Sequence, residues 1–486
     1  MSSEAGKSPA LSALYAAERR HGWFDFRLDG WAVWRVLRTP VYNVAAALPL
    51  SYTRESRKSQ LKRSLKATAG VLGYLLIGRH CDVLVKSFRS ALRSRHGDRF
   101  RDVYFDGVLD QQPSHFKLEV VNTTAFTRQA AQAFRPANAD AYAFTFWGAV
   151  LGRLFPCREA EVFCRDLAGS LQSEVGIEIG ERFLLQRLSA MYWESRLYAL
   201  LLARLRTRLV MVADTSEYAL RRACSMRGIP FVEMQHGVFD EDHPDAVPAW
   251  VSGSAAELLL PDALACYGPY WVARLAASRQ YGVAQPVGNE LVDYYRVRRL
   301  SRQVDEANTQ VHLLFTSQGI DTERAVAWLD TLLKSAPPNL RTTLTVKLHP
   351  AYDNDAAPYA GLVALHGAVL VAGSQEPNVW ELLTEADLHL SISSACHFDA
   401  AALGVPSVVM PLQGHYLMEA AINGRSIFSA QTPKAVWTLL ASLRGFTAAD
   451  MGEYASPGFT QRIDQLINRL CAASEQAQSS SAGELQ

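Results

Sequence analysis

Three short polar motifs each follow an apolar segment of the chain. Gln-His-Gly occupies residues 235–237, Lys-Leu-His-Pro residues 347–350, and Ser-Ile-Ser-Ser residues 391–394. The segments before them have the composition of buried parallel strands. Ligands of α/β proteins bind at the carboxyl edge of such sheets, where the residues that follow each strand lie. The sequence therefore predicts that these motifs line binding sites, the first in an N-terminal domain and the other two in a C-terminal domain.

The first motif offers a histidine suited to acid–base chemistry. His236 could hydrogen-bond an anionic group or accept a proton near neutral pH, and Gly237 would allow a sharp turn and the close approach of a ligand. A strand-end histidine with a structural role is the alternative. Residues 240–245 then place His243 among four acidic residues. Such spacing could bind a metal, but we expect a solvated acidic loop and no metal site.

The second motif brings two potential cations to one strand end. Lys347 and His349 alternate, so both side chains point to the same face if the strand persists. Pro350 would fix the turn that exposes the histidine. Two such groups at the mouth of a sheet suit a phosphate. An edge lysine and a capping histidine are the structural alternative.

The third motif is a cluster of hydroxyl groups before a helix expected at residues 398–403. Ser391, Ser393 and Ser394, with backbone N–H groups at the helix N-terminus, could form a phosphate cradle. Asp399 could orient these hydroxyl groups or contact a ribose. Weaker candidates of the same kind are Ser317, Gln318 and Gly319.

A carboxylate that could act in catalysis follows another apolar segment. Asp214 ends residues 208–214, and Glu217 opens the helix expected next. Enzymes that transfer glycosyl groups need a carboxylate near the anomeric carbon, as base or nucleophile. Capping of the following helix is the alternative for Asp214, and Asp106 is a weaker second candidate.

These motifs need a framework of alternating strands and helices. In the first half, strands are expected at residues 81–86, 102–107, 118–122, 208–214, 229–234, 262–267 and 284–289. In the second half, they are expected at residues 311–316, 342–348, 368–371, 388–392 and 405–410. Helices between them, such as residues 217–226 and 322–335, give the order of βαβ units. The sequence thus predicts an α/β protein with two doubly wound, Rossmann-like domains.

Changes in composition suggest the domain boundaries. A basic and aromatic helical front segment spans residues 1–66, an N-terminal Rossmann-like domain residues 67–300, and a C-terminal Rossmann-like domain residues 301–471. Residues 472–486 are rich in Ser, Gln and Ala, so we expect a disordered tail.

The front segment has two interpretations. Residues 54–66 carry six basic residues against one acidic residue, and aromatic residues such as Trp23 and Trp34 precede them. A basic helix beside aromatic residues could rest on an anionic membrane surface. The alternative is a solvated helix that packs through Leu61 and Leu65.

The composition argues against several classes of protein. With 486 residues, 49% of them hydrophobic, the chain can bury two cores, and a net charge of +1 gives no indication of nucleic-acid binding. Seven scattered cysteines without a CxxC pair argue against a disulfide framework or a zinc site. Residues 1–10 lack the apolar core of a signal peptide, and the apolar stretch at residues 67–78 is too short to span a bilayer. We therefore expect a cytoplasmic protein, at most peripheral at the inner face of the cytoplasmic membrane.

The order of the motifs resembles that of a known group of enzymes. A strand-end His-Gly, a Lys-x-His-Pro strand end, and a Ser-Ser pair followed by Gly-Val-Pro at residues 404–406 are similar to bacterial capsule and surface-polysaccharide glycosyltransferases. The most similar members use CMP-activated ulosonic sugars, namely Kdo transferases and bacterial sialyl- and polysialyltransferases. The resemblance covers roughly residues 80–440. It implies a GT-B fold, in which two Rossmann-like domains face each other across a cleft.

The resemblance also implies roles for the C-terminal motifs. His349 and Pro350 would contact the phosphate of CMP, and Ser393 and Ser394 would complete the phosphate site. No cofactor is implied, because CMP is a good leaving group that Lys347, His349 and helix N-termini can stabilise without a metal.

In the N-terminal domain, the resemblance implies the catalytic residues. His236 would face the sugar, and Asp214 best matches the carboxylate through which the Kdo transferases retain configuration. The chain lacks the Asp/Glu-Asp/Glu-Gly triplet of the sialyltransferases, which favours Kdo or a related ulosonic acid as the donor sugar. The acceptor would be a surface glycan or a lipid-linked glycan.

Other functions stay open on the sequence alone. The same His-Gly and His-Pro pattern resembles teichoic-acid-like polymerases that transfer glycerol phosphate from CDP-glycerol, so a CDP-polyol phosphotransferase is one alternative. A non-catalytic nucleotide-sugar-binding module and a sugar-nucleotide epimerase are two others.

Overall fold

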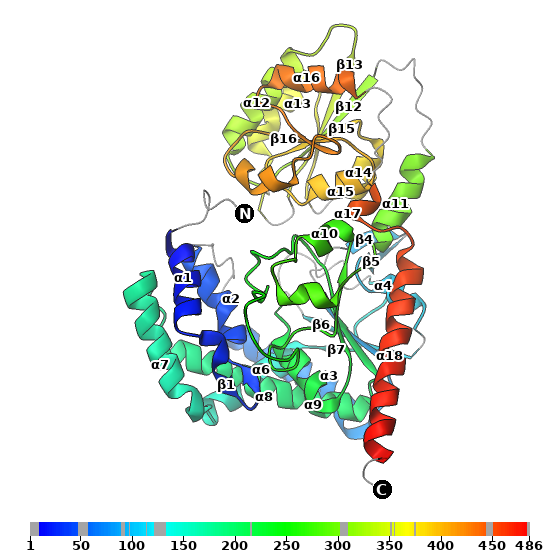
Figure 1. Cartoon of the computed structure of the whole chain (residues 1–486). Helices are drawn as coiled ribbons and strands as arrows, with labels where there is room; N and C mark the ends of the chain where they lie inside the picture. Colours follow the sequence, from blue (N-terminus) through cyan, green and yellow to red (C-terminus); the bar gives the residue numbers. More distant parts are fainter. Residues whose placement is uncertain are drawn as a thin grey trace. The chain divides into compact units, whose positions relative to one another are not determined.

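The computed structural model describes residues 9–46, 57–88, 93–96, 98–112, 114–120, 133–213, 216–301, 310–349, 352–353, 355–373, 376–443 and 451–483. The chain divides into two compact units, which Figure 1 colours along the sequence. Unit 1 comprises Met1–Cys266, Trp271–Gln285 and Thr460–Gln486, and unit 2 comprises Tyr267–Tyr270 and Pro286–Phe459.

A seven-stranded sheet forms the centre of unit 1, in the order β11-β10-β9-β8-β3-β6-β7. Its strands are β3 (Val83–Phe88), β6 (His115–Val120), β7 (Ala139–Asp140), β8 (Leu209–Val212), β9 (Phe231–Met234), β10 (Ala263–Cys266) and β11 (Ala284–Pro286). The pairings from β10 through to β7 are parallel. Every residue of β8, β9 and β10 is buried, as expected for parallel strands that are covered on both faces.

Several helices lie in or border unit 1 and pack on its sheet or on one another. They are α3 (Arg57–Ile77), α4 (Asp106–Asp110), α6 (Tyr142–Leu154), α7 (Glu161–Ser170), α8 (Glu181–Leu205), α9 (Tyr218–Arg227), α10 (Pro269–Ala273) and α18 (Phe459–Gly483). The contact of α6 with α8 depends on small residues, because a Cβ added to Gly152 would lie 2.6 Å from the backbone nitrogen of Ala190. Glycine at this position lets the two helix backbones approach closely.

The front of the chain is part of the core of unit 1. Helices α1 (Pro9–Arg20) and α2 (Trp34–Ala45) flank a short hairpin of β1 (Arg27–Leu28) and β2 (Trp31–Ala32). The side chains of Trp23, Phe24, Trp31 and Trp34 are buried in the hydrophobic core. These aromatic residues are therefore not available to a membrane, which corrects one basis of that interpretation.

Helix α3 does not pack through the leucines that were expected to hold it. Leu61 and Leu65 are exposed, whereas Ser64, Ala67 and Val71 are buried. The expectation that this helix packs through Leu61 and Leu65 is wrong, because the buried face is the one centred on the small residue Ser64.

The end of the chain belongs to unit 1. Helix α18 continues to Gly483, so the expectation of disorder is corrected for residues 472–483. Phe459, Ile463, Leu466 and Ile467 form a buried stripe at helical spacing. In addition, the Ser474 hydroxyl donates to the carbonyl oxygen of Gly228 at 3.2 Å.

A six-stranded sheet forms the centre of unit 2, in the order β14-β13-β12-β15-β16-β17. Its strands are β12 (Gln310–Thr316), β13 (Arg341–Lys347), β14 (Val369–Val371), β15 (Leu388–Ser391), β16 (Ser407–Val409) and β17 (Ile427–Ser429). All of its pairings are parallel.

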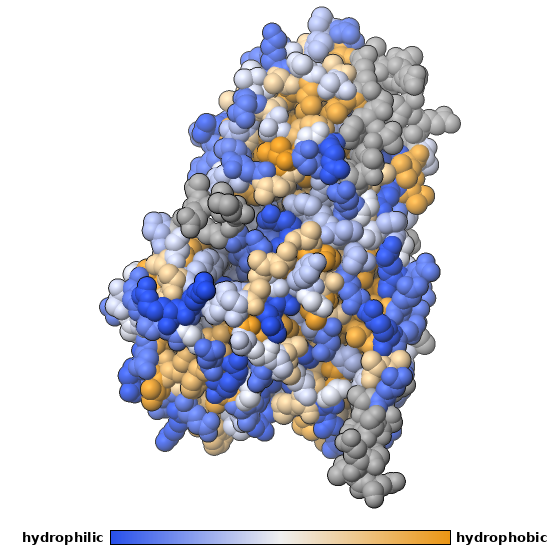
Figure 2. All heavy atoms as spheres, in the orientation of Figure 1, coloured by the Kyte–Doolittle hydropathy of each residue, from blue (hydrophilic) through white to orange (hydrophobic). Residues whose placement is uncertain are grey.

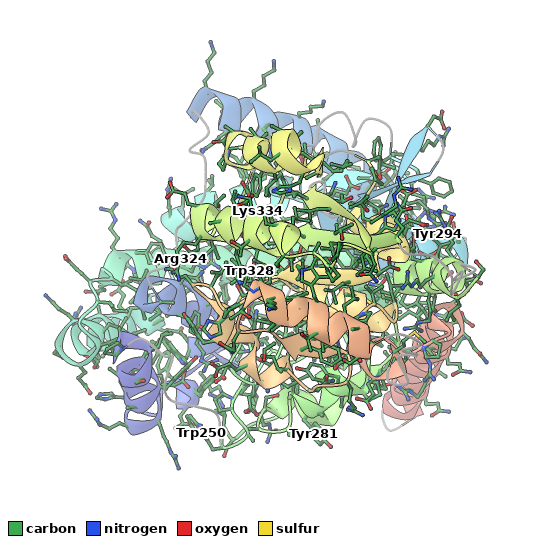
Figure 3. All side chains as sticks on the ribbon, turned by 90° about the horizontal axis from the view of Figure 1, so that it is seen from above. Trp250, Tyr281, Tyr294, Arg324, Trp328 and Lys334 are labelled. Carbon is green, nitrogen blue, oxygen red and sulfur yellow. The ribbon has the colours of Figure 1, made fainter. Side chains whose placement is uncertain are left out.

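The helices of unit 2 carry apolar residues toward this sheet. They are α11 (Glu290–Leu300), α12 (Thr322–Lys334), α13 (Ala360–His366), α14 (Val379–Glu385), α15 (Cys396–Ala402), α16 (Pro433–Ser442) and α17 (Met451–Tyr454). In α12, Trp328 belongs to the core, while Arg324 and Lys334 are exposed (Figure 3).

One expected strand is absent from the described residues 98–112. At residues 102–107 the chain instead turns and enters α4. Asp102 Oδ1 accepts from the backbone N–H of Tyr104 at 3.0 Å, and Asp106 Oδ2 accepts from the backbone N–H of Asp102 at 2.8 Å. These aspartate bonds offer the backbone an alternative to a strand ladder. The preceding residues form an antiparallel pair of β4 (Arg93–His96) and β5 (Arg99–Asp102).

The prediction of two α/β, Rossmann-like domains is confirmed by the two parallel sheets and the helices that follow their strands. Most of the described surface of the face in Figure 2 is hydrophilic, with hydrophobic residues in small groups. In the described part of the chain, no helix combines the length and the apolar composition needed to cross a membrane.

Candidate functional site

The polar motifs of unit 2 lie together at the carboxyl edge of its sheet. β12 lies between β13 and β15. The tips after these strands are residues 317–319, 347–349 and 391–394. The backbone N–H of Ser317 donates to the carbonyl oxygen of Lys347 at 2.9 Å, and Ser317 Oγ accepts from the backbone N–H of His349 at 3.2 Å. The backbone N–H of Ser393 donates to Gln318 Oε1 at 2.8 Å. The structure thus joins three motifs into one group, the edge cluster, made of Ser317, Gln318, Gly319, Lys347, His349, Ser391, Ser393 and Ser394.

The hydrogen bonds of His349 fix the position of its ring proton. Nδ1 accepts from the backbone N–H of Tyr352 at 3.1 Å, and the two rings stack with centroids 4.6 Å apart. Burial lowers the pKa of His349 below its usual value of 6.5, against a smaller opposing contribution from Asp353. The imidazole is therefore neutral at pH 7 and carries its proton on Nε2. This N–H can donate to an oxygen of a ligand.

Lys347 has a different environment from the one its spacing suggested. Its side chain is buried, and Nζ donates to the carbonyl oxygens of Ala372 and Pro377 at 3.0 and 3.1 Å. Burial lowers the pKa of Lys347 to about 8, with an opposing contribution from Glu376. Lys347 thus secures the chain after β14, and its contact with a phosphate stays a prediction.

The three serines of the edge cluster divide into supporting and accessible residues. Ser391 Oγ is buried and donates to the carbonyl oxygen of Thr316 at 2.7 Å, which links β15 to β12. Ser394 Oγ accepts from the backbone N–H of Cys396 at 3.2 Å, at the start of α15. Ser393 is partly exposed, and its Oγ lies 3.4 Å from Gln318 Oε1. Of the three hydroxyl groups, that of Ser393 is best placed to meet a ligand.

Gly319 is required by the shape of the edge cluster. Its φ of +68° lies in the left-handed region, and a Cβ added there would lie 2.3 Å from the carbonyl oxygen of Tyr352. Asp399, in contrast, lies within α15, where burial raises its pKa to about 6 with a smaller opposing contribution from Trp380. A role of Asp399 in orienting the serines stays a prediction.

The accessible part of the edge cluster consists of neutral groups. Gln318, Gly319, His349 and Ser393 are partly or fully exposed, whereas Ser317, Ser391, Ser394 and Lys347 are buried. An amide, an imidazole N–H and a hydroxyl can all donate hydrogen bonds to a phosphate or a sugar. The predicted contribution of Pro350 lies outside the described residues.

A buried histidine pair beneath this edge was not predicted. His389 Nε2 lies 2.9 Å from Thr316 Oγ1, and Ser407 Oγ lies 2.7 Å from His389 Nδ1 and 2.6 Å from His397 Nδ1. Burial lowers the pKa of His389 well below 6.5 and that of His397 to about 3, so both are neutral. A polar residue inside the apolar segment 388–391 was the signal for His389.

In unit 1, the predicted catalytic carboxylate Asp214 lies outside the described residues. Glu217 forms a hydrogen-bonded ion pair with Lys86, whose Nζ also lies 5.4 Å from the centre of the Tyr198 ring. Burial acts to lower the pKa of Lys86, but Glu217, Tyr198 and Glu194 raise it above its ordinary value. Lys86, which lies within β3, is therefore protonated at neutral pH. A catalytic role of Glu217 stays a prediction, and the structure shows that its carboxylate is held by this lysine.

His236 follows β9 at the surface of unit 1. Its imidazole is exposed, desolvation by the surrounding protein lowers its pKa below 6.5, and its carbonyl oxygen accepts from the Tyr104 hydroxyl at 3.1 Å. Gln235 is buried and its amide donates to the carbonyl oxygen of Gly237 at 2.8 Å. Gly237 is outside the left-handed region and has room for a Cβ. The expected sharp turn therefore does not require glycine, and only close approach of a ligand would.

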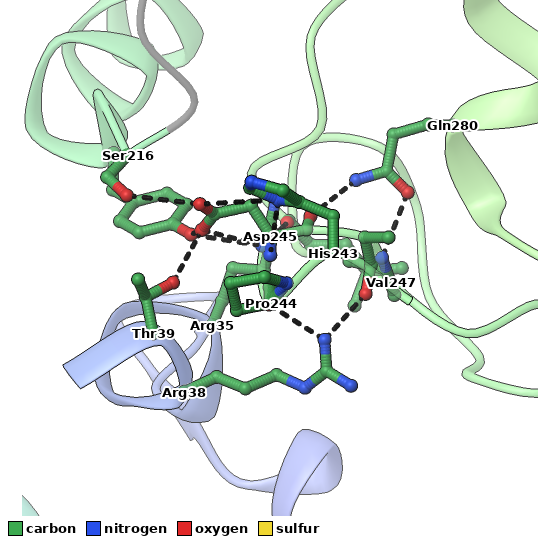
Figure 4. Close-up of polar contacts among 12 residues, drawn as sticks. Arg35, Arg38, Thr39, Ser216, His243, Pro244, Asp245, Val247 and Gln280 are labelled. Atoms are coloured by element: carbon green, nitrogen blue, oxygen red, sulfur yellow. Dashed lines mark hydrogen bonds and ion pairs between the residues drawn. The ribbon is translucent and has the colours of Figure 1, made fainter. Parts of the chain in front are cut away.

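The acidic loop after His236 is not solvated at its centre. Asp245 is 2% exposed and lies 3.6 Å from the guanidinium of Arg35, which is equally buried (Figure 4). Its carboxylate also accepts from Tyr218 Oη, from Thr39 Oγ1 at 2.7 Å and from Ser216 Oγ at 3.2 Å. The expectation of a solvated loop is therefore wrong for Asp245, because α2 supplies a buried cation to it.

A second arginine of α2 holds the same loop. Arg38 donates to the carbonyl oxygens of Pro244 and Ala246, both at 2.7 Å (Figure 4). It also forms an ion pair with Glu18 at 2.6 Å. At the start of the loop, Arg274 lies 2.9 Å from Asp240. The front helices thus fix the loop between His236 and residue 247.

Two further features bear on the sequence-based candidates. Asp106 is buried and paired with Lys117 at 2.8 Å, within a group that includes Asp102 at 3.1 Å from the same amine, so its described role is structural. Among the residues that the structure describes, no group of three or more His, Cys, Asp or Glu side chains is placed to hold a metal ion.

Comparisons with known proteins give a likeness in chain trace only. No family model matches the chain, and no curated protein matches its sequence. A variant of the wall teichoic acid polymerase TagF is 11% identical, over 87% of this chain and 99% of that chain, with a TM-score of 0.45. MurG of Acinetobacter baumannii is 14% identical, over 80% and 99%, with a TM-score of 0.46. UDP-GlcNAc 2-epimerase from Neisseria meningitidis, bound to UDP-GlcNAc, is 12% identical, over 80% and 99%, with a TM-score of 0.43. At such values the likeness assigns no activity.

Proposed function

We propose that the protein is a glycosyltransferase that uses a nucleotide-activated sugar. The observation that carries the proposal is the edge cluster of unit 2. The three motifs are spread over residues 317–394. They meet on neighbouring parallel strands, and direct hydrogen bonds join them. The carboxyl edge of such a sheet is where α/β proteins bind nucleotides.

The chemistry of the edge cluster suits a phosphate that is recognised by hydrogen bonds. His349 offers a neutral Nε2–H, and Gln318 and Ser393 lie beside it with partly exposed side chains. Donors that are already in place stabilise the charge that develops on a leaving phosphate without a reorganisation cost. We propose CMP as this leaving group, because a single phosphate can be satisfied by a few such donors.

Unit 1 would supply the acid–base chemistry and bind the acceptor. His236 is exposed and has a pKa below 6.5, so it is a neutral base near pH 7. Asp214 remains the proposed carboxylate near the anomeric carbon. By the sequence resemblance, the donor would carry Kdo or a related ulosonic acid, and the acceptor would be a surface glycan or a lipid-linked glycan. We propose that the domains act as in a GT-B enzyme.

The first test is calorimetric titration of the full chain with CMP, CDP, UDP and GDP. Selective binding of CMP is expected. His349→Asn keeps an acceptor for the Tyr352 N–H but loses the donor at Nε2, and it should weaken binding about tenfold or more, the value of one hydrogen bond to a charged group. His349→Gln retains a donor near Nε2 and should bind CMP better than His349→Asn does.

His312→Ala is the matched control in this unit. His312 lies in β12 and its Nδ1 is 3.0 Å from Thr343 Oγ1, within the body of the sheet. It should bind CMP as the unchanged protein does. Equal binding by His349→Asn and the unchanged protein would contradict the assigned phosphate site, and a preference for UDP or GDP would contradict the proposed donor.

A donor series then separates the alternative functions. Transfer from CMP-Kdo to an acceptor, with loss of turnover and retained CMP affinity in Asp214→Asn and His236→Ala, is the expected result. Transfer from CDP-glycerol would identify a CDP-polyol phosphotransferase. Conversion of the donor without an acceptor would identify an epimerase, and CMP binding without any turnover would identify a binding module.

A further inference from the structure

Helix α3 is held to unit 1 by one face. The residues that it buries are Ser64, Ala67 and Val71. The Arg63 guanidinium lies 3.8 Å from the centre of the Tyr142 ring and 4.0 Å from a carboxylate oxygen of Asp140. Near the other end, Tyr74 packs edge-on against Phe116, with ring centroids 4.7 Å apart. These contacts fix which side of the helix points outward.

The outward side carries a row of large apolar residues. Leu61, Leu65, Leu72 and Leu76 are 53%, 60%, 47% and 77% exposed. At 3.6 residues per turn, these four positions fall within an arc of about 60°. Trp147 of α6 is next to this row, because its Nε1 donates to Thr68 Oγ1 at 2.9 Å, and it is 38% exposed. Contiguous exposed apolar residues of this size mark a surface that meets a partner.

Lysines line one side of the row. Lys58, Lys62 and Lys66 are exposed and follow one another at intervals of four residues, so they share a flank of the helix. Arg57–Ile77 contains no acidic residue. A leucine ridge beside a lysine flank is complementary to a surface with an apolar interior and anionic headgroups.

We propose that this outer face, defined as Leu61, Leu65, Leu72, Leu76, Trp147 and the three lysines, binds an anionic lipid membrane. The helix would lie parallel to the bilayer, with the leucines and the tryptophan at the level of the headgroups and the lysines on the anionic lipids. Tryptophan is enriched at this level of membranes because its ring is apolar while its N–H is polar. The exposed lysines, in a helix without an acidic residue, favour an anionic lipid surface.

The proposal differs from a membrane contact of the front segment as a whole. The tryptophans at positions 23, 31 and 34 are buried in the core of unit 1, whereas α3 and its neighbour Trp147 present exposed apolar residues beside lysines. The outer face therefore binds lipid with or without nucleotide, and the proposal does not depend on the proposed function.

The test is sedimentation of the full chain with vesicles, without nucleotide or acceptor, at low and high salt. One set of vesicles is phosphatidylcholine alone, and the other contains about 30% phosphatidylglycerol, roughly the anionic content of a bacterial or cytoplasmic leaflet. Binding to the anionic vesicles is expected, with little binding to neutral ones and a decrease at high salt. Lys58→Gln, Lys62→Gln and Lys66→Gln combined should weaken binding roughly 100-fold, at about fivefold per lysine. Leu65→Gln, Leu72→Gln and Leu76→Gln combined should weaken it at least ~10-fold.

Matched controls use exposed residues elsewhere. Val162→Gln and Leu365→Gln replace side chains that are 62% and 71% exposed, and Lys334→Gln removes a lysine of α12 whose side chain is 63% exposed. These variants should bind vesicles as the unchanged protein does. The proposal is overturned if the protein does not sediment with anionic vesicles, if it binds neutral vesicles equally, or if the α3 variants bind as the controls do. Self-association that the leucine variants abolish, without vesicle binding, would also overturn it in favour of a protein partner.

Discussion

The carboxyl edges of the two sheets use their polar residues in opposite ways. In unit 1, charged groups dominate and are paired inside the protein: Asp245 with Arg35, and Glu217 with Lys86. In unit 2, the accessible groups of the edge cluster are neutral, and its one lysine is turned onto two carbonyl oxygens. A buried ion pair is costly to separate, whereas neutral donors can exchange water for a ligand at little cost. The described charged groups of unit 1 are thus paired within the protein, whereas the accessible groups of unit 2 keep the capacity to donate hydrogen bonds.

The largest expected effect is the loss of the buried pair in unit 1. Asp245→Ala leaves the Arg35 guanidinium buried without its carboxylate, so we expect the free energy of unfolding of unit 1 to fall by about 3–5 kcal/mol. Urea unfolding followed by amide hydrogen exchange measures this change unit by unit. Asp166→Ala, at an exposed position of α7 in the same unit, is the control and should change stability little. The contrast between the two units would be contradicted if Asp245→Ala were as stable as this control. It would also be contradicted if the variant lost CMP binding at urea concentrations below its unfolding transition.

The next effect concerns the shape of the edge cluster. Gly319→Ala would place a Cβ against the carbonyl oxygen of Tyr352 at a φ of +68°, which costs about 1–3 kcal/mol. We expect CMP affinity to fall about tenfold or more, because the turn carries Gln318 beside Ser393. Gly361→Ala, in α13 where an added Cβ meets open space, should be neutral or slightly stabilising. Unchanged CMP affinity in Gly319→Ala would show that the ligand binds elsewhere.

The buried histidines of unit 2 predict a loss of stability in acid. The pKa of His397 is lowered to about 3, and that of His389 well below 6.5, by burial. Below pH 6.5 the unfolded chain takes up protons that the folded chain does not, so stability is complete above pH 6.5 and falls as the pH decreases toward the folded pKa. The slope is about 1.4 kcal/mol per pH unit for each histidine.

Urea unfolding between pH 7 and pH 4 tests this prediction. His397→Asn retains an acceptor or donor for Ser407. In acid, it should reduce the dependence of the stability of unit 2 on pH by the contribution of one histidine. His243 in unit 1 also has a pKa of about 3 because of its burial, and His243→Asn should flatten the slope of unit 1 only. A pH-independent stability in this range would contradict the neutral state of all three residues.

The smallest expected effect is the loss of a single hydroxyl at the edge. Ser393→Ala retains the backbone N–H bond to Gln318 and removes only the hydroxyl, so CMP affinity should fall two- to tenfold, about 0.5–1.5 kcal/mol. Stability should hardly change, because Ser393 is partly exposed. Ser391→Ala should do the reverse, since Ser391 Oγ is buried and links β15 to Thr316. Equal effects of the two changes on affinity would remove the distinction between supporting and accessible serines.

The sequence predicted the framework well because strands of parallel sheets are continuous apolar segments. β8, β9, β12, β13 and β15 each lie within or overlap the expected segments. The grouping of the unit 2 motifs followed from the same rule, because residues after adjacent strands share an edge. The strand expected at residues 102–107 does not form, because the carboxylates of Asp102 and Asp106 accept hydrogen bonds from backbone N–H groups there.

The polar network of unit 1 could not be predicted in the same way. Arg35 and Asp245 are separated by 210 positions in the sequence, and no periodicity indicates that α2 packs on the loop after β9. The front segment was interpreted as a basic helix beside aromatic residues, but Trp23, Trp34, Arg35 and Arg38 are buried. Asp214 and Pro350 lie outside the described residues, so their roles stay predictions.

The position of α18 in unit 1 has a consequence for synthesis on the ribosome. Apart from Tyr267–Tyr270, unit 2 is formed by Pro286–Phe459, so unit 1 begins before it and is completed after it. As the chain emerges, unit 2 can finish folding while the part of unit 1 that α18 will cover is still exposed. Domains generally fold as units in the order of their emergence, but here the first domain to start is the last to close. A ribosome that stalls late would leave a folded unit 2 tethered to an unfinished unit 1.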